Sequence, residues 1–151
     1  EGKGDVFTPL PVPLVEKNYF SLPTAGSILP PTIPLSIPAD LDGYWLVLVK
    51  PNDFISTREA YAAVTPRPSK VSLKDIISQP VKTWRGQMVN DFEASVFPTH
   101  PVVSSICDQL YMLGASYAAM SGSGSTVYGL FRQQPVLGEV FSGCFLWQCK
   151  L

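Results

Sequence analysis

The sequence predicts an α+β domain built on a ferredoxin-like split βαβ sheet with extra helices, preceded by a proline-rich extended arm. Three observations lead to this fold class. From residue 42 onward the hydrophobic patterns follow the order strand, helices, strand, strand, helix, strand, which is the order of that sheet. Hydrophobic residues make up 46% of the chain and charged residues 15%, which suits a packed core. Eight of the 15 prolines lie before residue 42, in a stretch that cannot form a helix.

Length and charge exclude several classes of protein. The 151 residues suffice for one domain, or for one domain with a tail. The net charge is −1, whereas a surface that binds nucleic-acid phosphates broadly needs a basic excess, so we expect no nucleic-acid partner. The longest apolar runs are too short to span a bilayer, so we expect no membrane segment.

Cysteine usage indicates a reducing compartment. Cys107, Cys144 and Cys149 are odd in number and have no CxxC spacing. The single histidine, His100, cannot complete a Cys/His zinc set, and we interpret it as structural. We therefore expect three buried thiols rather than disulfides and no metal site, and we take the cytosol as the compartment.

Residues 1–41 are interpreted as a linker and extended arm, and residues 42–151 as the folded domain. In residues 11–41 the prolines exclude a helix and the only charges are Glu16, Lys17 and Asp40. The arm either packs on a partner surface or is a flexible linker. Residues 1–10 lack an initial Met and open on a Gly-Lys-Gly turn, so we expect the chain to be a fragment of a longer protein.

The domain is predicted to begin with a strand and two short helices. Residues 44–50 are β-branched, aromatic and nearly uncharged, which predicts a buried strand. Ser56 and Glu59 have the spacing of a capping box, which predicts a helix that runs to about Val64. A second short helix is predicted within residues 72–79.

Two longer helices are predicted next. Residues 84–97 carry large apolar residues at four-residue spacing, which predicts a helix that Pro98 stops; they are Trp84, Met88, Phe92 and Val96. Residues 102–113 place their apolar side chains on one side of another helix, and Gly114 follows as its C′ residue.

The remaining elements complete the sheet. Residues 116–120 and 126–131 have the pattern of two strands joined by a short loop. Residues 136–141 predict a short amphipathic helix, and residues 144–150 predict the last strand.

The loop between those two strands is the strongest candidate for chemistry. It consists of Ser121, Gly122, Ser123, Gly124, Ser125 and Thr126. Its glycines free the backbone to turn successive N–H groups inward, which makes a cradle for an anion such as phosphate. The loop does not match G-x-G-x-x-G, because Val127 holds the last position, nor the P-loop, because it has no lysine. A plain hairpin loop is the alternative interpretation.

Two other groups of residues are candidates with simple structural alternatives. Asn90 and Asp91 open a helical stretch and can brace a neighbouring loop, but with Glu93 they also fit a solvated face. Thr57 and Tyr61 lie one helical turn apart, so a hydroxyl and a ring on one side can hold a nucleobase. The alternative is that the helix start is capped and Tyr61 packs.

Four segments, in this order, resemble the C-terminal half of the GHMP kinases: residues 46–51, 55–61, 90–93 and 120–131. Within that family they are most similar to the kinases that phosphorylate a diphosphocytidyl sugar alcohol in non-mevalonate isoprenoid biosynthesis. Residues 2–10 resemble the segment that leaves the N-terminal domain of those enzymes. The stretch 11–41 has no counterpart.

The resemblance implies the C-terminal domain of a two-domain, ATP-dependent kinase whose active site lies in the cleft between its domains. The ATP-binding loop, the catalytic lysine and the catalytic aspartate belong to the N-terminal half, so the resemblance implies no catalytic residue in this chain and no activity for the fragment. ATP and Mg²⁺ would act in the longer parent. The implied partners are the N-terminal kinase domain and a small-molecule diphosphocytidyl sugar alcohol.

The same resemblance assigns roles to the candidate residues. The loop from Ser121 to Thr126 would line the phosphate side of the cleft, and Thr57 and Tyr61 would border the cytidine pocket. Asn90 and Asp91 would support the loop. The alternative to a kinase half is a free-standing ferredoxin-like module that binds a small molecule or a protein through the apolar residues 28–37.

Overall fold

The computed structural model describes residues 41–66 and 71–151 of the chain. The segment at residues 1–10 and the predicted arm, except for its last residue Leu41, lie outside the described residues.

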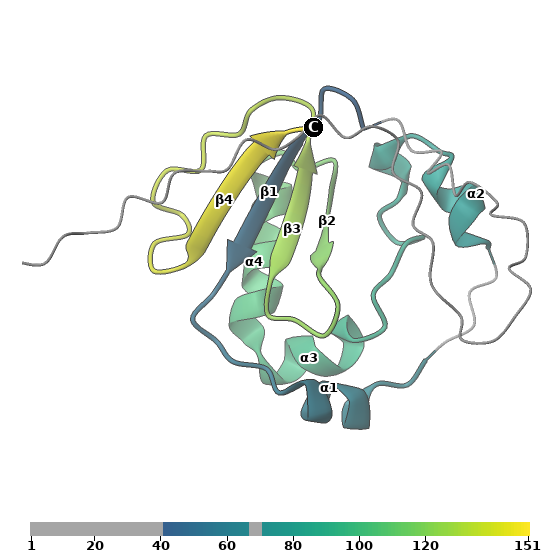
Figure 1. Ribbon diagram of the computed structural model, residues 1–151, viewed down its shortest axis with the longest axis vertical. Helices are drawn as coiled ribbons and strands as arrows, with labels where there is room; N and C mark the ends of the chain where they lie inside the picture. The colour runs from purple at the N-terminus through teal and green to yellow at the C-terminus, as the bar shows by residue number, and fades with distance from the viewer. Residues whose placement is uncertain (1–40, 67–70) are drawn as a thin grey trace, which may run out of the picture. The chain divides into compact units, whose positions relative to one another are not determined.

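Four antiparallel strands form one sheet in the order β2-β3-β1-β4 (Figure 1). The strands are β1 Trp45–Lys50, β2 Tyr117–Met120, β3 Val127–Phe131 and β4 Phe145–Lys150. Because β3 lies between β1 and β2 and is antiparallel to both, β1 and β2 run parallel to each other with helices in their connection. This is the split βαβ arrangement, so the predicted fold class is confirmed.

The helices are α1 Thr57–Ala63, α2 Leu73–Ile77, α3 Glu93–Thr99 and α4 Pro101–Met112, with a 3₁₀ turn η1 at Val81–Thr83. Helix α4 packs on one face of the sheet, where Val103 and Leu110 meet fully buried valines of β1 and β3. Residues of α2 and η1 cover part of the opposite face, against Tyr117 and Leu130. Alternate residues of the strands therefore enter two separate apolar cores.

The end of α4 is formed by a glycine, as predicted. Leu113 is the C-cap and Gly114 follows with φ +97°. The N–H of Gly114 donates to the carbonyl of Tyr111 and the N–H of Ala115 donates to that of Leu110, each at 3.0 Å. These two bonds are the Schellman motif, which satisfies carbonyls that the helix leaves without partners.

The helix predicted over residues 84–97 is wrong in its first half. The structure has turns from Trp84 to Phe92, and α3 begins only at Glu93. Gly86 takes φ +80°, and the side chain of Asn90 accepts a hydrogen bond from the Phe92 N–H at 3.0 Å, so local bonds replace helical ones. Pro98 also does not stop the helix, which ends one residue later at Thr99.

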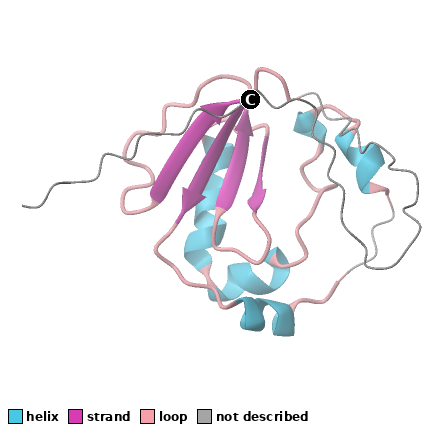
Figure 2. Ribbon diagram, viewed as in Figure 1, coloured by secondary structure: helices cyan, strands magenta, loops and turns pink. Residues whose placement is uncertain are grey.

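Two smaller predictions also fail. Residues 136–141 form turns, and the connection between β3 and β4 contains no helix (Figure 2). Gly138 at φ +52° interrupts this segment, although Leu137 and Phe141 are buried as the amphipathic pattern suggests. Ser56 occupies the N-cap of α1, but its side chain makes no capping hydrogen bond.

Across the described ranges 41–66 and 71–151, none of the helices has the length and apolar character needed to cross a membrane.

Candidate functional site

The loop of residues 121–126 closes the β2–β3 hairpin at one end of the sheet (Figure 1). Two of its amides are used inside the loop: Ser121 N–H donates to Thr126 O at 2.8 Å, and Gly124 N–H donates to Ser121 O at 3.0 Å. Among the described residues, no group accepts a hydrogen bond from the other four main-chain amides, which belong to Gly122, Ser123, Ser125 and Thr126. These four are the amides that remain for an anion.

The two glycines of the loop have different physical roles. Gly122 has φ +57°, and a Cβ built there would have no neighbour within 4 Å. Gly124 has φ +95°, and a Cβ there would lie 2.7 Å from Ile55 Cδ1 and 2.8 Å from Met120 Sδ. Gly122 therefore supplies backbone freedom alone, whereas Gly124 also leaves space for two core side chains.

The hydroxyl of Ser125 ties the loop to the segment between β1 and α1. Ser125 is 5% exposed, and its Oγ donates to the carbonyl of Asp53 at 2.6 Å. The side chain of Asp53 in turn lies 3.0 Å from Nδ1 of His100, at the start of α4. The Ser125 hydroxyl is thus a structural link and not a free donor for an anion.

Asn90 contacts the loop directly. Its Nδ2 donates to the carbonyl oxygens of Met120 and Gly122, both at 2.8 Å. Its Oδ1 accepts from the Phe92 N–H, so the amide group is oriented from both ends. The structure therefore brings Asn90 to the glycine-rich loop, while Asp91 lines a neighbouring hollow.

Glu93 also contacts the root of the loop, which sequence reasoning missed. Its Oε1 accepts from the Met120 N–H at 2.7 Å. Burial raises the pKa of this carboxyl, and the bond from Met120 opposes the rise without cancelling it. The one signal in the sequence is that Glu93 follows Asn90 by three residues, so both side chains can reach the same partner. That partner, Met120 in β2, lies 27 residues after Glu93.

Thr57 and Tyr61 are both exposed on α1, at the same end of the sheet as the loop (Figure 1). The ring of Tyr61 is 64% exposed and contacts Phe92 edge to face, with 5.0 Å between ring centroids. Ile55, just before α1, packs beside Gly124. The predicted nucleobase residues and the predicted phosphate loop thus belong to one region of the domain.

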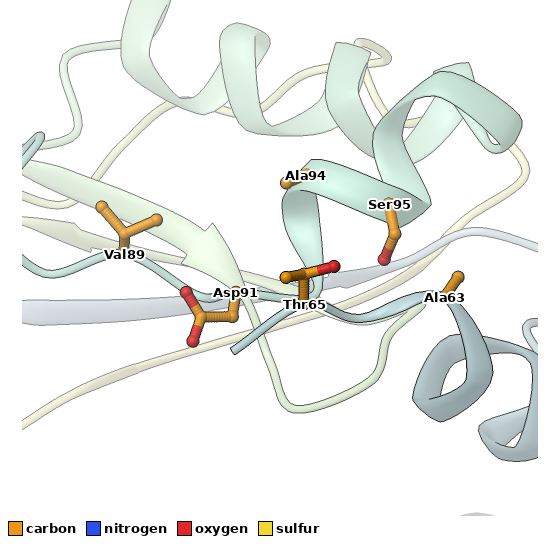
Figure 3. Close-up of a pocket in the computed structure, with 6 residues that line it drawn as sticks. All are labelled: Ala63, Thr65, Val89, Asp91, Ala94 and Ser95. Carbon is orange, nitrogen blue, oxygen red and sulfur yellow. The ribbon is translucent and has the colours of Figure 1, made fainter. Parts of the chain in front are cut away.

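Two hollows lie between α1 and α3. The first has a volume of about 240 Å³ and is drawn in Figure 3; its walls are Ala63, Thr65, Val89, Asp91, Ala94 and Ser95. The second, of about 290 Å³, adjoins it, since Ala63 and Ser95 line both, and it extends to Glu59 and His100. Neither hollow is lined by Thr57, Tyr61 or the loop.

No group of three or more His, Cys, Asp or Glu side chains is placed to hold a metal ion in the part of the chain that the structure describes. The donors at the loop are neutral amides and hydroxyls. Their chemistry suits a phosphate oxygen and does not suit a cation.

Comparison with known proteins gives a consistent result. Residues 73–142 match the family described as GHMP kinases C terminal. A protein of Parabacteroides distasonis is 55% identical over 118 residues, which are 76% of this chain and 44% of that protein. A protein of Bacteroides thetaiotaomicron is 50% identical over 103 residues, 68% of this chain and 38% of its own length.

A third relative, from Bacteroides fragilis, is 50% identical over 117 residues, 76% of this chain and 43% of that protein. All three are named 4-diphosphocytidyl-2-C-methyl-D-erythritol kinase. The chain spans less than half the length of each of these relatives.

Proposed function

Because this chain carries a C-terminal domain of the GHMP kinase family, we propose that it is the substrate-side half of an ATP-dependent kinase that phosphorylates 4-diphosphocytidyl-2-C-methyl-D-erythritol. The observation that carries this proposal is 55% identity over 118 residues to a protein named for that reaction. The loop geometry supports it, since four main-chain amides at the end of a hairpin have no acceptor among the described residues.

The loop lines the phosphate side of the active-site cleft. Phosphoryl transfer depends on positioning and on stabilisation of spread negative charge, and oriented amides contribute to both. The Ser123 amide belongs to the peptide whose carbonyl Asn90 holds, so this donor is oriented before a ligand arrives. A fixed donor loses little further entropy on binding.

Thr57 and Tyr61 border the cytidine of the substrate. The exposed ring of Tyr61 offers a face for stacking, and its edge contact with Phe92 limits its rotation. The hydroxyl of Thr57, one turn away on the exposed side of α1, offers a hydrogen bond to the base.

The remaining machinery belongs to an N-terminal kinase domain. Residues 1–41 form the linker from that domain, and residues 42–151 form the C-terminal domain. ATP and Mg²⁺ bind to the N-terminal part, which supplies the cationic groups that this loop lacks. The chain by itself therefore transfers no phosphoryl group and acquires activity only beside its N-terminal partner.

A chimera tests the proposal. The part of the Parabacteroides distasonis protein that aligns with this chain is replaced by the corresponding part of this chain, and ATP-dependent phosphorylation of 4-diphosphocytidyl-2-C-methyl-D-erythritol is measured beside the unaltered relative. We expect kcat/KM within about tenfold of the relative, and no turnover by this chain alone. A folded chimera without activity, where the relative is active, would contradict the proposal.

A further inference from the structure

The outer edge of β2 carries polar main-chain groups that no neighbouring strand among the described residues binds. β2 is an edge strand, so alternate N–H and C=O groups along it face away from β3. Ser121 N–H points to Thr126 on the β3 side, which places the polar groups of Met120 on the outer side. Buried groups of this kind need partners.

Side chains supply those partners where a neighbouring strand would otherwise lie. The Tyr111 hydroxyl donates to Ala118 O at 2.9 Å. Two residues further along the strand, Glu93 accepts the Met120 N–H at 2.7 Å and Asn90 donates to the Met120 carbonyl at 2.8 Å. Asn90 and Glu93 thus bind both polar main-chain groups of the residue directly before the loop; we call this pair the Met120 clamp.

The Met120 clamp also determines a direction inside the loop. Asn90 holds the carbonyl of Gly122 at 2.8 Å. The peptide between Gly122 and Ser123 is trans, so its N–H points opposite to its C=O. Holding the Gly122 carbonyl toward Asn90 therefore directs the Ser123 N–H away from Asn90, where no described group accepts it.

We propose that Glu93, acting together with Asn90, is a positioning residue that directs the Ser123 main-chain N–H toward a phosphate group of the substrate. The inference rests on the proposed function, because it takes the ligand of the loop to be an anion. Glu93 acts through Met120, which it holds at the loop root, and Asn90 acts through the Gly122 carbonyl. Loss of either contact frees the loop to turn that amide elsewhere.

The experiment uses the 151-residue chain labelled for NMR, with inorganic pyrophosphate as the probe. Glu93→Ala removes the acceptor, whereas Glu93→Gln retains an oxygen that can accept the Met120 N–H. Asn90→Asp keeps the oxygen that faces Phe92 and removes the donor to Met120 and Gly122. Glu139→Ala is the matched control, an exposed glutamate in the β3–β4 connection.

We expect Glu93→Ala and Asn90→Asp to shift the Ser123 amide resonance in the free chain and to weaken pyrophosphate binding at least about tenfold, the scale of one charge-assisted contact. Glu93→Gln and Glu139→Ala should bind within about twofold of wild type. The rescue by glutamine separates positioning from loss of packing, because glutamine and glutamate have nearly the same size.

The possible failures are distinguishable. A wild-type chain whose loop amides do not respond to pyrophosphate would contradict the anion-binding role, and with it both the proposed function of the loop and this inference. A wild-type response that Glu93→Ala and Asn90→Asp leave unchanged would overturn the positioning role alone. If Glu93→Ala does not fold, Asn90→Asp decides the question by the same two measurements.

Discussion

At the scale of single residues, we expect substitution of the two loop glycines to lower the free energy of unfolding by different amounts. Gly124→Ala places a methyl group within 2.8 Å of both Ile55 and Met120 at φ +95°, so strain and overpacking add. We expect a loss of about 3 kcal/mol in the free energy of unfolding. Gly122→Ala carries backbone strain alone and should cost about 1 kcal/mol. Urea denaturation measures both, and equal losses would contradict this difference.

The raised pKa of Glu93 predicts that the free energy of unfolding depends on pH. Burial raises the pKa of this carboxyl above its ordinary value of 4.5, so between 4.5 and the raised pKa the folded protein holds a proton that the unfolded chain has released. The resulting stabilisation is complete below pH 4.5 and is lost as the pH rises through the folded pKa. Glu93→Gln removes this titration.

The free energy of unfolding of wild type relative to Glu93→Gln should therefore be highest at acidic pH and should fall toward neutral pH. Urea denaturation of both proteins from about pH 4 upward checks this, because other titrating groups cancel in the difference. A difference that does not vary with pH would show that the Glu93 pKa is not raised.

The prediction of three buried thiols holds for Cys107 and is wrong for Cys144 and Cys149, which are partly exposed because they lie beside and in the exposed strand β4. Cys107 on α4 gives a chemical test at the same scale. Burial raises its pKa to about 12, and the neighbouring carboxylates of Glu93 and Asp108 add to the rise. The reactive thiolate is therefore scarce at about pH 8. We expect iodoacetamide to leave Cys107 unmodified in the folded protein and to alkylate it in urea, as followed by peptide mass spectrometry. Rapid alkylation of the folded protein would contradict this burial.

At the scale of elements, the end of α4 carries the clearest prediction. Gly114 has φ +97° and no neighbour within 4 Å of a built Cβ, so only backbone conformation matters there. Gly114→Ala should lower the free energy of unfolding by about 1 kcal/mol, and Gly114→Asn should cost less because asparagine tolerates the left-handed region. Thermal or urea denaturation that ranks the two in the reverse order would contradict the Schellman cap.

Local sequence patterns predicted most helices and strands well, because the conformation of these elements is set mainly by the residues within them. The strands are short apolar runs with few charges, α4 has its apolar residues on one side, and Gly114 ends α4 as expected. The helix predicted over residues 84–97 does not form in its first half, for a physical reason. Its apolar residues do recur every four positions, but they enter two different cores. Trp84 is buried with α2 and η1, whereas Val96 is buried under α4.

The candidate site was only partly predictable. The Ser/Gly loop is visible in sequence because glycine signals a special backbone. The role of Glu93 was missed because its partner, the Met120 N–H, is free to bind a side chain only when β2 is an edge strand. Whether β2 is an edge strand depends on the order of all four strands. Ser125 also binds a partner distant in sequence, the carbonyl of Asp53, 72 residues away.

At the scale of the whole described domain, three segments distant in sequence meet at one end of the sheet. The β1–α1 connection binds the loop through Asp53. The segment that leads into and begins α3 binds the loop through Asn90 and the end of β2, directly before the loop, through Glu93. The third segment is the β2–β3 hairpin that contains the loop. This convergence places the predicted phosphate loop near α1, which carries Thr57 and Tyr61. We propose that this end of the domain is half of a kinase active site.

The most direct measurement compares Gly122→Val with Gly143→Val in the active chimera. Both glycines have positive φ, +57° and +81°, and neither has a neighbour within 4 Å of a built Cβ, so their costs in stability should match. Gly143 lies in the β3–β4 connection. We predict that Gly122→Val lowers kcat/KM at least about tenfold and that Gly143→Val changes it less than about twofold. Equal activity of the two variants would contradict the claim that the loop belongs to the active site.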